Sequence, residues 1–73
     1  MDIHKYITMR KDREFNRKII GLIRSGGKVA TTTEIAEKMK VSWNTAEKHL
    51  LEIALEGKIS RLKKAGVNLW VLH

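Results

Sequence analysis

The stretch TTTEIAEKMKVSWNTAEKHLLEIALEG, residues 31–57, decides how this chain folds. Its opening letters match a capping box, in which the Thr31 side chain accepts a hydrogen bond at a helix start and Glu34 reaches back to the Thr31 amide. We therefore predict a short helix that begins after Thr31 and runs through Met39. Its apolar residues share one side and are expected to face the core: Ile35, Ala36 and Met39.

A second helix is predicted directly afterwards, over residues 42–56. Ser42 is a favourable N-cap, and Val41 and Ala46 occupy the two positions of a hydrophobic staple. Gly57 is expected to end the helix in the left-handed conformation. The core-facing positions are predicted to be Ala46, Leu50 and Ile53.

Upstream, residues 10–25 predict a longer amphipathic helix that ends at Gly26 and Gly27. Its apolar residues recur at helical spacing: Phe15, Ile19, Leu22 and Ile23. The opposite side is basic: Arg10, Arg13, Arg17 and Arg24. This basic stripe is interpreted either as a solvated face or as an edge that contacts phosphates. Residues 1–9 are expected to form an N-terminal arm or a short extra element, and residues 10–73 the main domain.

The other segments carry the β-branched and aromatic residues that favour strands. A short strand is predicted within residues 28–31, and a hairpin from residues 58–63 and 68–72 with its turn at 64–67. The order of elements is therefore helix, short strand, helix, turn, helix and hairpin. This order defines an α+β fold that is mostly α.

Composition limits what so short a chain can do. Its 73 residues form one domain with a small core, and a formal net charge of +7 favours an anionic partner, nucleic acid first. The absence of cysteine excludes disulfides and thiolate metal sites, and three scattered histidines lack metal-ligand spacing. No apolar run could cross a bilayer and no signal peptide is evident, so we expect a cytoplasmic, DNA-associated protein. The lack of Pro, Cys and Gln resembles the composition of thermophilic proteins.

Taken together, these elements resemble the winged helix-turn-helix family of small, prokaryotic-type transcriptional regulators. The resemblance covers residues 10–72 and rests on EIA at 34–36, VS at 41–42, TA at 45–46, HL at 49–50, LEGKIS at 55–60 and LWVL at 69–72. It implies three helices, a short strand between the first two, and a C-terminal β-hairpin wing. The family usually places glycine in the turn between its second and third helices, where this chain has Lys40. Lysine adopts the required left-handed conformation at modest cost.

The resemblance implies that helix 42–56 is the recognition helix, with its N-terminal half in the major groove of duplex DNA. Asn44 and Lys48 lie on the wheel face opposite the core residues. Asn44 suits bidentate contact with adenine, and Lys48 suits guanine or a phosphate. Ser42 at the helix start is expected to touch a phosphate, and Thr45 flanks the same face.

Three further residues of this helix have more than one interpretation. Glu47 could accept a hydrogen bond from a cytosine amino group, form a surface pair, or repel phosphate. Trp43 lies near the edge of the core face, so that burial and contact with a thymine methyl group are both open. His49 is interpreted as a partly buried, hydrogen-bonded residue rather than a ligand or a switch.

The predicted wing supplies a second set of cations. Arg61, Lys63 and Lys64 lie on the hairpin or at its turn, suited to the DNA backbone or the minor groove. Lys28 and Lys40, near the two ends of the second helix, could clamp phosphates beside the groove. The alternative is a wing that is merely solvated.

Two apolar sets are left without a place in the predicted core. Leu51 and Leu55 point away from it and need a cover, supplied by Trp70 or Leu72 or by another chain. Ile3, Tyr6 and Ile7 fall off the core stripe of the first helix if that helix is extended backward. Both sets predict a homodimer, in which two recognition helices read half-sites one helical turn apart. The alternative is an N-terminal arm that folds over its own domain.

These features predict a sequence-specific DNA-binding regulator that acts by occupancy. Two alternatives stay open: a non-specific architectural DNA or RNA binder, and a winged-helix protein-interaction module that uses Trp43, Leu51 and Leu55. An enzyme is not expected, because no nucleophile elbow, phosphate loop or carboxylate pair is present. We expect no cofactor, no metal, no membrane partner and no small-molecule effector.

Overall fold

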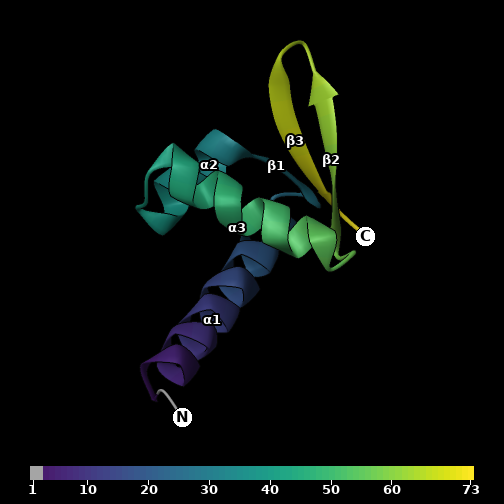
Figure 1. Cartoon of the computed structure of the whole chain (residues 1–73). Coiled ribbons are helices and arrows are strands. Elements are labelled where there is room, and N and C mark those ends of the chain that lie inside the picture. The colour runs from purple at the N-terminus through teal and green to yellow at the C-terminus, as the bar shows by residue number, and fades with distance from the viewer. Residues whose placement is uncertain (1–2) are drawn as a thin grey trace.

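The computed structural model describes the backbone of residues 3–73 and the side chains of residues 12–73. Three helices and three strands follow one another as α1 (Ile3–Ser25), β1 (Val29–Thr31), α2 (Thr32–Met39), α3 (Trp43–Leu55), β2 (Ile59–Lys64) and β3 (Val67–Leu72) (Figure 1). This order confirms the predicted α+β fold, including the short strand between the first two helices and the C-terminal hairpin.

The three strands form one antiparallel sheet in the order β1-β3-β2, so the last strand in sequence is central. Within it, Trp70 lies opposite Ala30 on one neighbour and Arg61 on the other. The hairpin reverses at Ala65 and Gly66, whose φ angles are 51° and 78°. Two successive positive φ angles are typical of the tight turns that match the twist of a hairpin. The turn lies where the sequence predicted it.

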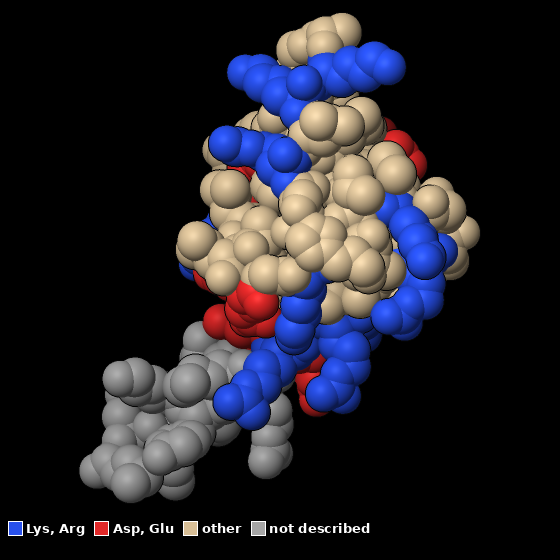
Figure 2. Space-filling view, turned by 90° about the vertical axis from the view of Figure 1, so that its right-hand side faces the viewer, with Lys and Arg blue, Asp and Glu red and all other residues tan. Residues whose placement is uncertain are grey.

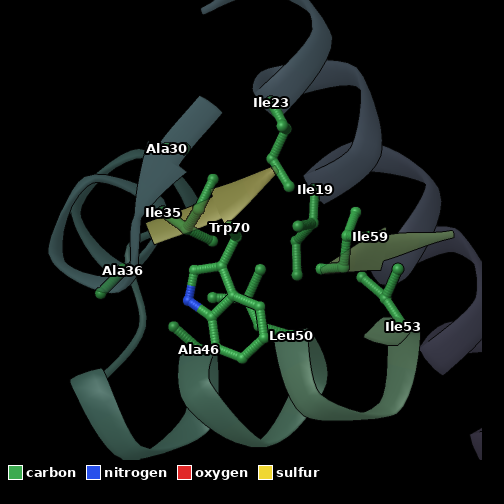
Figure 3. Close-up of a cluster of buried hydrophobic side chains, with 10 residues drawn as sticks. All are labelled: Ile19, Ile23, Ala30, Ile35, Ala36, Ala46, Leu50, Ile53, Ile59 and Trp70. Atoms are coloured by element: carbon green, nitrogen blue, oxygen red, sulfur yellow. The ribbon is translucent and has the colours of Figure 1, made fainter. Parts of the chain in front are cut away.

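The core lies between the helices and one face of the sheet. Trp70 is fully buried at its centre (Figure 3), and its indole Nε1 donates a 2.8 Å hydrogen bond to Thr32 Oγ1. The other buried apolar residues are Ile19, Ile23, Ala30, Ile35, Ala36, Ala46, Leu50, Ile53 and Ile59. The predicted core positions Phe15, Leu22 and Met39, and the predicted staple residue Val41, are partly buried against this cluster.

The predicted caps set the starts of α2 and α3. The Glu34 amide donates to Thr31 Oγ1 at 3.0 Å, and the Thr31 amide donates to Glu34 Oε1 at 3.3 Å, which completes the capping box. The Ser42 side chain accepts from the Thr45 amide at 3.2 Å. Each cap satisfies an amide that the first turn of a helix leaves without a partner.

Lys40 ends α2 in the left-handed conformation, with φ 58° and ψ 45°. We expect Lys40→Gly to raise the free energy of unfolding by up to about 1 kcal/mol, because glycine removes the cost of a Cβ atom at this φ. Lys38→Gly is the matched control, since it removes the same charge from the helical interior and should lower stability by about 1 kcal/mol. Urea unfolding followed by circular dichroism measures both. Equal destabilisation by the two variants would contradict the prediction.

α1 is continuous across residues 9 and 10, because residues 3–20 contain neither glycine nor proline to interrupt it. Its N-terminal part extends away from the rest of the fold (Figure 1). The side chains of Ile3, Tyr6 and Ile7, which were predicted to face a partner, and that of Arg10 lie outside the described residues. Among the described residues, no helix combines the length and the apolar character needed to cross a membrane.

Candidate nucleic-acid interface

One face of α3 is exposed over its N-terminal half. Asn44 and Lys48 are solvent-exposed on this face, while the opposite residues Ala46, Leu50 and Ile53 are fully buried. Packing of three apolar side chains against the core therefore fixes the rotation of α3 about its own axis. The predicted core positions of α3 are the buried ones, and Asn44 and Lys48 are exposed as expected.

Ser42 and Thr45 form a pair at the start of α3. In addition to the cap, the Ser42 hydroxyl lies 2.9 Å from the Thr45 hydroxyl and donates to it. Both residues are exposed. The pair holds two hydroxyl groups at the positive end of the helix dipole, where an anion is stabilised.

The register of the hairpin divides its three cations between two faces. Lys63 lies opposite Asn68 and Arg61 opposite Trp70, so both share the face that packs on α3. Lys64 lies opposite Val67, on the other face at the tip. All three cations are exposed, and Lys and Arg side chains gather over the hairpin at the top of Figure 2.

A side-chain contact joins α3 to the wing. Asn68 Nδ2 donates to Glu47 Oε2 at 3.3 Å, while Glu47 Oε1 is buried and has no hydrogen-bond partner among the described residues. Glu47 is therefore turned toward β3 rather than displayed outward beside Asn44 and Lys48. The sequence analysis missed Asn68, although the alternation of strand residues counted from Trp70 places position 68 on the inner face.

Trp43 lies at the edge of a shallow groove between the helices and the hairpin turn. Its side chain is 47% exposed, so the interpretation as a buried core residue is wrong. The groove has a volume of about 170 Å³ and is lined by Thr32, Thr33, Trp43, Gly66, Val67 and Asn68. It therefore lies next to the Glu47–Asn68 contact and brings the start of α3 near the tip of the wing.

His49 is a structural residue, as predicted. It is buried, its Nδ1 lies 2.9 Å from Asn16 Oδ1, and its ring centroid lies 4.3 Å from that of Phe15. Glu52 Oε2 is 3.8 Å from the same nitrogen. The contacts with Asn16 and Phe15 attach α3 to α1. The described residues contain no group of three His, Cys, Asp or Glu side chains that could hold a metal ion.

The remaining predicted site residues are dispersed. Lys28 and Lys40 are exposed at the two ends of the β1–α2 unit, each with a positive φ. Arg13 and Arg17 line a separate groove with Lys58, near the C-terminal end of α3. The wing does not cover Leu51 and Leu55: Trp70 is fully occupied in the core, and Leu55 is 89% exposed.

A pair of helices joined by a short turn, followed by an antiparallel hairpin that packs beside the second helix of the pair, defines the winged-helix class. The chain has this fold, with α2 and α3 as the helix pair and β2 and β3 as the wing. Within that class it belongs to the family DUF977, described as "bacterial protein of unknown function", whose model matches residues 3–69. No curated protein matches the chain.

Two solved structures have a similar fold. The Zalpha domain from Carassius auratus PKZ in complex with Z-DNA has a TM-score of 0.79 and 21% identity, over 86% of this chain and 98% of that one. The oxidized form of MarR from E. coli has a TM-score of 0.68 and 22% identity, over 100% of this chain and 64% of that one. At these identities the similarity establishes a shared winged-helix fold.

Proposed function

We propose that the chain binds double-stranded DNA in a sequence-specific manner and acts as a transcriptional regulator. Residues 42–56 enter the major groove, and residues 58–72 lie on the backbone or in the minor groove. One observation carries this proposal: the exposed face of α3, with Asn44 and Lys48, adjoins a hairpin whose Arg61 and Lys63 share the same side. That surface combines groups that read bases with groups that hold phosphates.

The chemistry of the α3 face suits the base edges in a major groove. The Asn44 amide can bond adenine in bidentate fashion, and the Lys48 ammonium can donate to guanine or to a phosphate. The hydroxyls of Ser42 and Thr45 lie at the helix start, which favours phosphate contact. Half-exposed Trp43 offers an apolar surface to a thymine methyl group.

The charges of the wing support the same orientation of the chain on DNA. No Asp or Glu lies on β1, β2 or β3, whereas β2 carries Arg61, Lys63 and Lys64. A wing with cations alone is attracted to a phosphate backbone whatever the base sequence. Lys28 and Lys40 would add phosphate contacts beside α2. The Zalpha domain, solved with Z-DNA, is a further support, because its fold is similar to this one.

The first test is a fluorescence-anisotropy titration of the full chain. It compares a duplex selected from a random pool with a scrambled duplex of equal length, at two salt concentrations. We expect tighter binding to the selected duplex, with a preference that survives added salt. Equal binding to both duplexes that collapses in salt would identify a non-specific architectural binder, and tighter binding to RNA would identify an RNA protein. No binding at low salt would contradict a nucleic-acid function.

Lys63→Ala is expected to weaken binding to every duplex alike and to lower the slope of log K against log salt by about 1, because one phosphate contact is lost. Lys64→Ala, at the tip of the wing, should likewise weaken binding and lower the salt slope. Lys18→Ala is the matched control, since it removes one exposed lysine from α1, which runs away from the wing (Figure 1). If the control changed the slope as much as Lys63→Ala, binding would reflect net charge alone.

We also propose that the chain forms a homodimer, with half-sites one helical turn apart on DNA. Exposed Leu51 and Leu55 on α3 support an apolar contact, and Ile3, Tyr6 and Ile7 are the further residues expected in it. Sedimentation equilibrium of the full chain measures the mass. A monomer at all concentrations, with and without duplex, would contradict the dimer.

A protein-interaction module is the second candidate function. Half-exposed Trp43 and the leucines Leu51 and Leu55 favour it, because exposed apolar residues on one helix are common at docking faces. The anisotropy titration separates the two functions. A module of this kind would bind neither duplex at low salt.

A further inference from the structure

The sheet has an outer face that faces away from the core. The inner face is fixed by Trp70, Ala30 and Ile59, which are buried among the helices (Figure 3). Because strand residues alternate and paired residues share a face, the outer face carries five apolar side chains. They are Val29, Leu62, Val67, Leu69 and Val71.

These five side chains are adjacent on the face: Val29, Leu62 and Val67 are exposed, and Leu69 and Val71 are half-buried. Leu62 lies opposite Leu69 and Val29 lies opposite Val71, while Val67 is two residues before Leu69 on the same face of β3. The exposed fractions are 54% for Leu62, 47% for Val67 and 40% for Val29. Three strands therefore contribute to one apolar surface.

This pattern departs from that of an antiparallel sheet with a solvated face. Such a sheet alternates apolar residues toward the core with polar residues toward water. In β3, however, Leu69 and Val71 are outside while Trp70 and Leu72 are inside, so the strand is apolar on both faces. Strands with this composition are typical of sheets that are covered on both sides.

The charges around the outer face are of one sign. Lys64 lies on it beside Val67, and exposed Lys28 precedes Val29. Beyond residue 11, every Asp and Glu lies on a helix or at the C-cap of α3. In a twofold contact between two outer faces, the same lysines would meet without an acidic residue to pair with, which disfavours a second copy as the cover.

An anionic bilayer is a poorer match. Trp and Tyr are enriched where proteins meet a membrane interface, whereas the apolar side chains of the outer face are all Val or Leu. The combination of an apolar centre and a cationic border is complementary to an apolar ridge with an acidic border.

We propose that the outer face of the sheet is a docking site for a partner protein that presents an amphipathic segment with leucine-like side chains flanked by Asp and Glu. The site goes beyond DNA binding, because its five apolar side chains lie on the face opposite to the one that packs on α3, although its bordering Lys28 and Lys64 are also proposed phosphate contacts. The small area of five side chains favours a weak complex that exchanges rapidly.

The test uses a designed helical peptide as probe, with leucines at positions i, i+3, i+4 and i+7 and glutamates at the flanking positions. Methyl NMR spectra of the full chain are recorded as the peptide is added. We expect saturable shifts of the Val29, Leu62, Val67, Leu69 and Val71 methyl groups, and no comparable shifts at Leu51 or Leu55. A peptide with lysines in place of the glutamates should bind at least about 10-fold more weakly.

The double variant Leu62→Thr and Val67→Thr should weaken the glutamate peptide at least about 10-fold, because it removes apolar contacts and keeps β-branched strand formers. Leu55→Ala is the matched control, since it removes an exposed leucine from α3, and it should leave the affinity unchanged. Both variants should retain the circular dichroism spectrum of the parent.

Four outcomes would overturn the proposal. These are no binding of the glutamate peptide, equal binding of the lysine peptide, shifts confined to α3 or to the inner face of the wing, and an unchanged affinity of the double variant. Binding of the parent, but not of the double variant, to vesicles of phosphatidylcholine and phosphatidylserine would assign the face to lipid instead. Self-association that the double variant abolishes would assign it to a second copy.

Discussion

Trp70→Ala is expected to lower the free energy of unfolding by about 3–5 kcal/mol. Trp70 is fully buried on the central strand of the sheet, so its loss leaves a cavity that three helices and two other strands border (Figure 3). A domain of this length is expected to have a total stability of only about 4–11 kcal/mol. The variant should therefore be close to unfolding in water. Urea unfolding followed by far-UV circular dichroism measures the change.

Milder variants keep this prediction testable if Trp70→Ala does not fold. Trp70→Phe should cost less than the alanine variant, because a ring still fills much of the cavity. Thr32→Val removes the acceptor of the indole N–H and should cost about 1–3 kcal/mol, since the buried donor is left without a partner. Trp43→Phe is the matched control at a half-exposed site and should change little. If Trp70→Phe and Thr32→Val lowered the free energy of unfolding no more than Trp43→Phe does, the central role of Trp70 would be contradicted.

Asn44→Ala is expected to reduce the preference for the selected duplex by about 10- to 100-fold, which corresponds to about 1–3 kcal/mol. The physical reason is the loss of a bidentate donor and acceptor at one base, while the phosphate contacts of the wing remain. Binding to the scrambled duplex should hardly change. Anisotropy titrations of both duplexes at one salt concentration give the ratio directly.

Glu56→Ala serves as the control for Asn44→Ala, because it also truncates an exposed side chain but at the C-cap of α3, at the opposite end of the helix. It should leave the preference intact. If Asn44→Ala weakened the two duplexes equally, Asn44 would be a backbone contact. If it changed neither, the exposed N-terminal face of α3 would not be the base-reading surface.

The ends of α2 and α3 could be predicted from the sequence because the signals that set them are local, whereas α1 begins at Ile3 and not at the predicted residue 10. The capping box at Thr31 and Glu34, the N-cap at Ser42 and the left-handed Lys40 each depend on a few neighbouring residues. The apolar repeat of α3 likewise identified Ala46, Leu50 and Ile53 as core residues. At these positions local propensity and tertiary packing favour the same structure.

The features that sequence reasoning missed depend on pairing between distant segments. The Glu47–Asn68 contact crosses 21 positions, and neither residue type by itself predicts the other. The outer face of the sheet arises from the register of β1, β2 and β3, which the hydrophobic pattern of a single strand cannot provide. Trp43 was ambiguous because its wheel position lies at the edge of the core face, where the neighbouring hairpin turn decides its exposure.

The contact between Glu47 and Asn68 has a consequence for the DNA shapes that the proposed interface would accept. It joins α3 to the wing within the chain itself, so that on a duplex bound as proposed the two surfaces would not act as independent arms. In the proposed complex, a duplex that touches both would have to present a readable base edge and a phosphate at a matching spacing. Sequences whose groove width departs from it would be rejected by their shape, even where every base edge is correct.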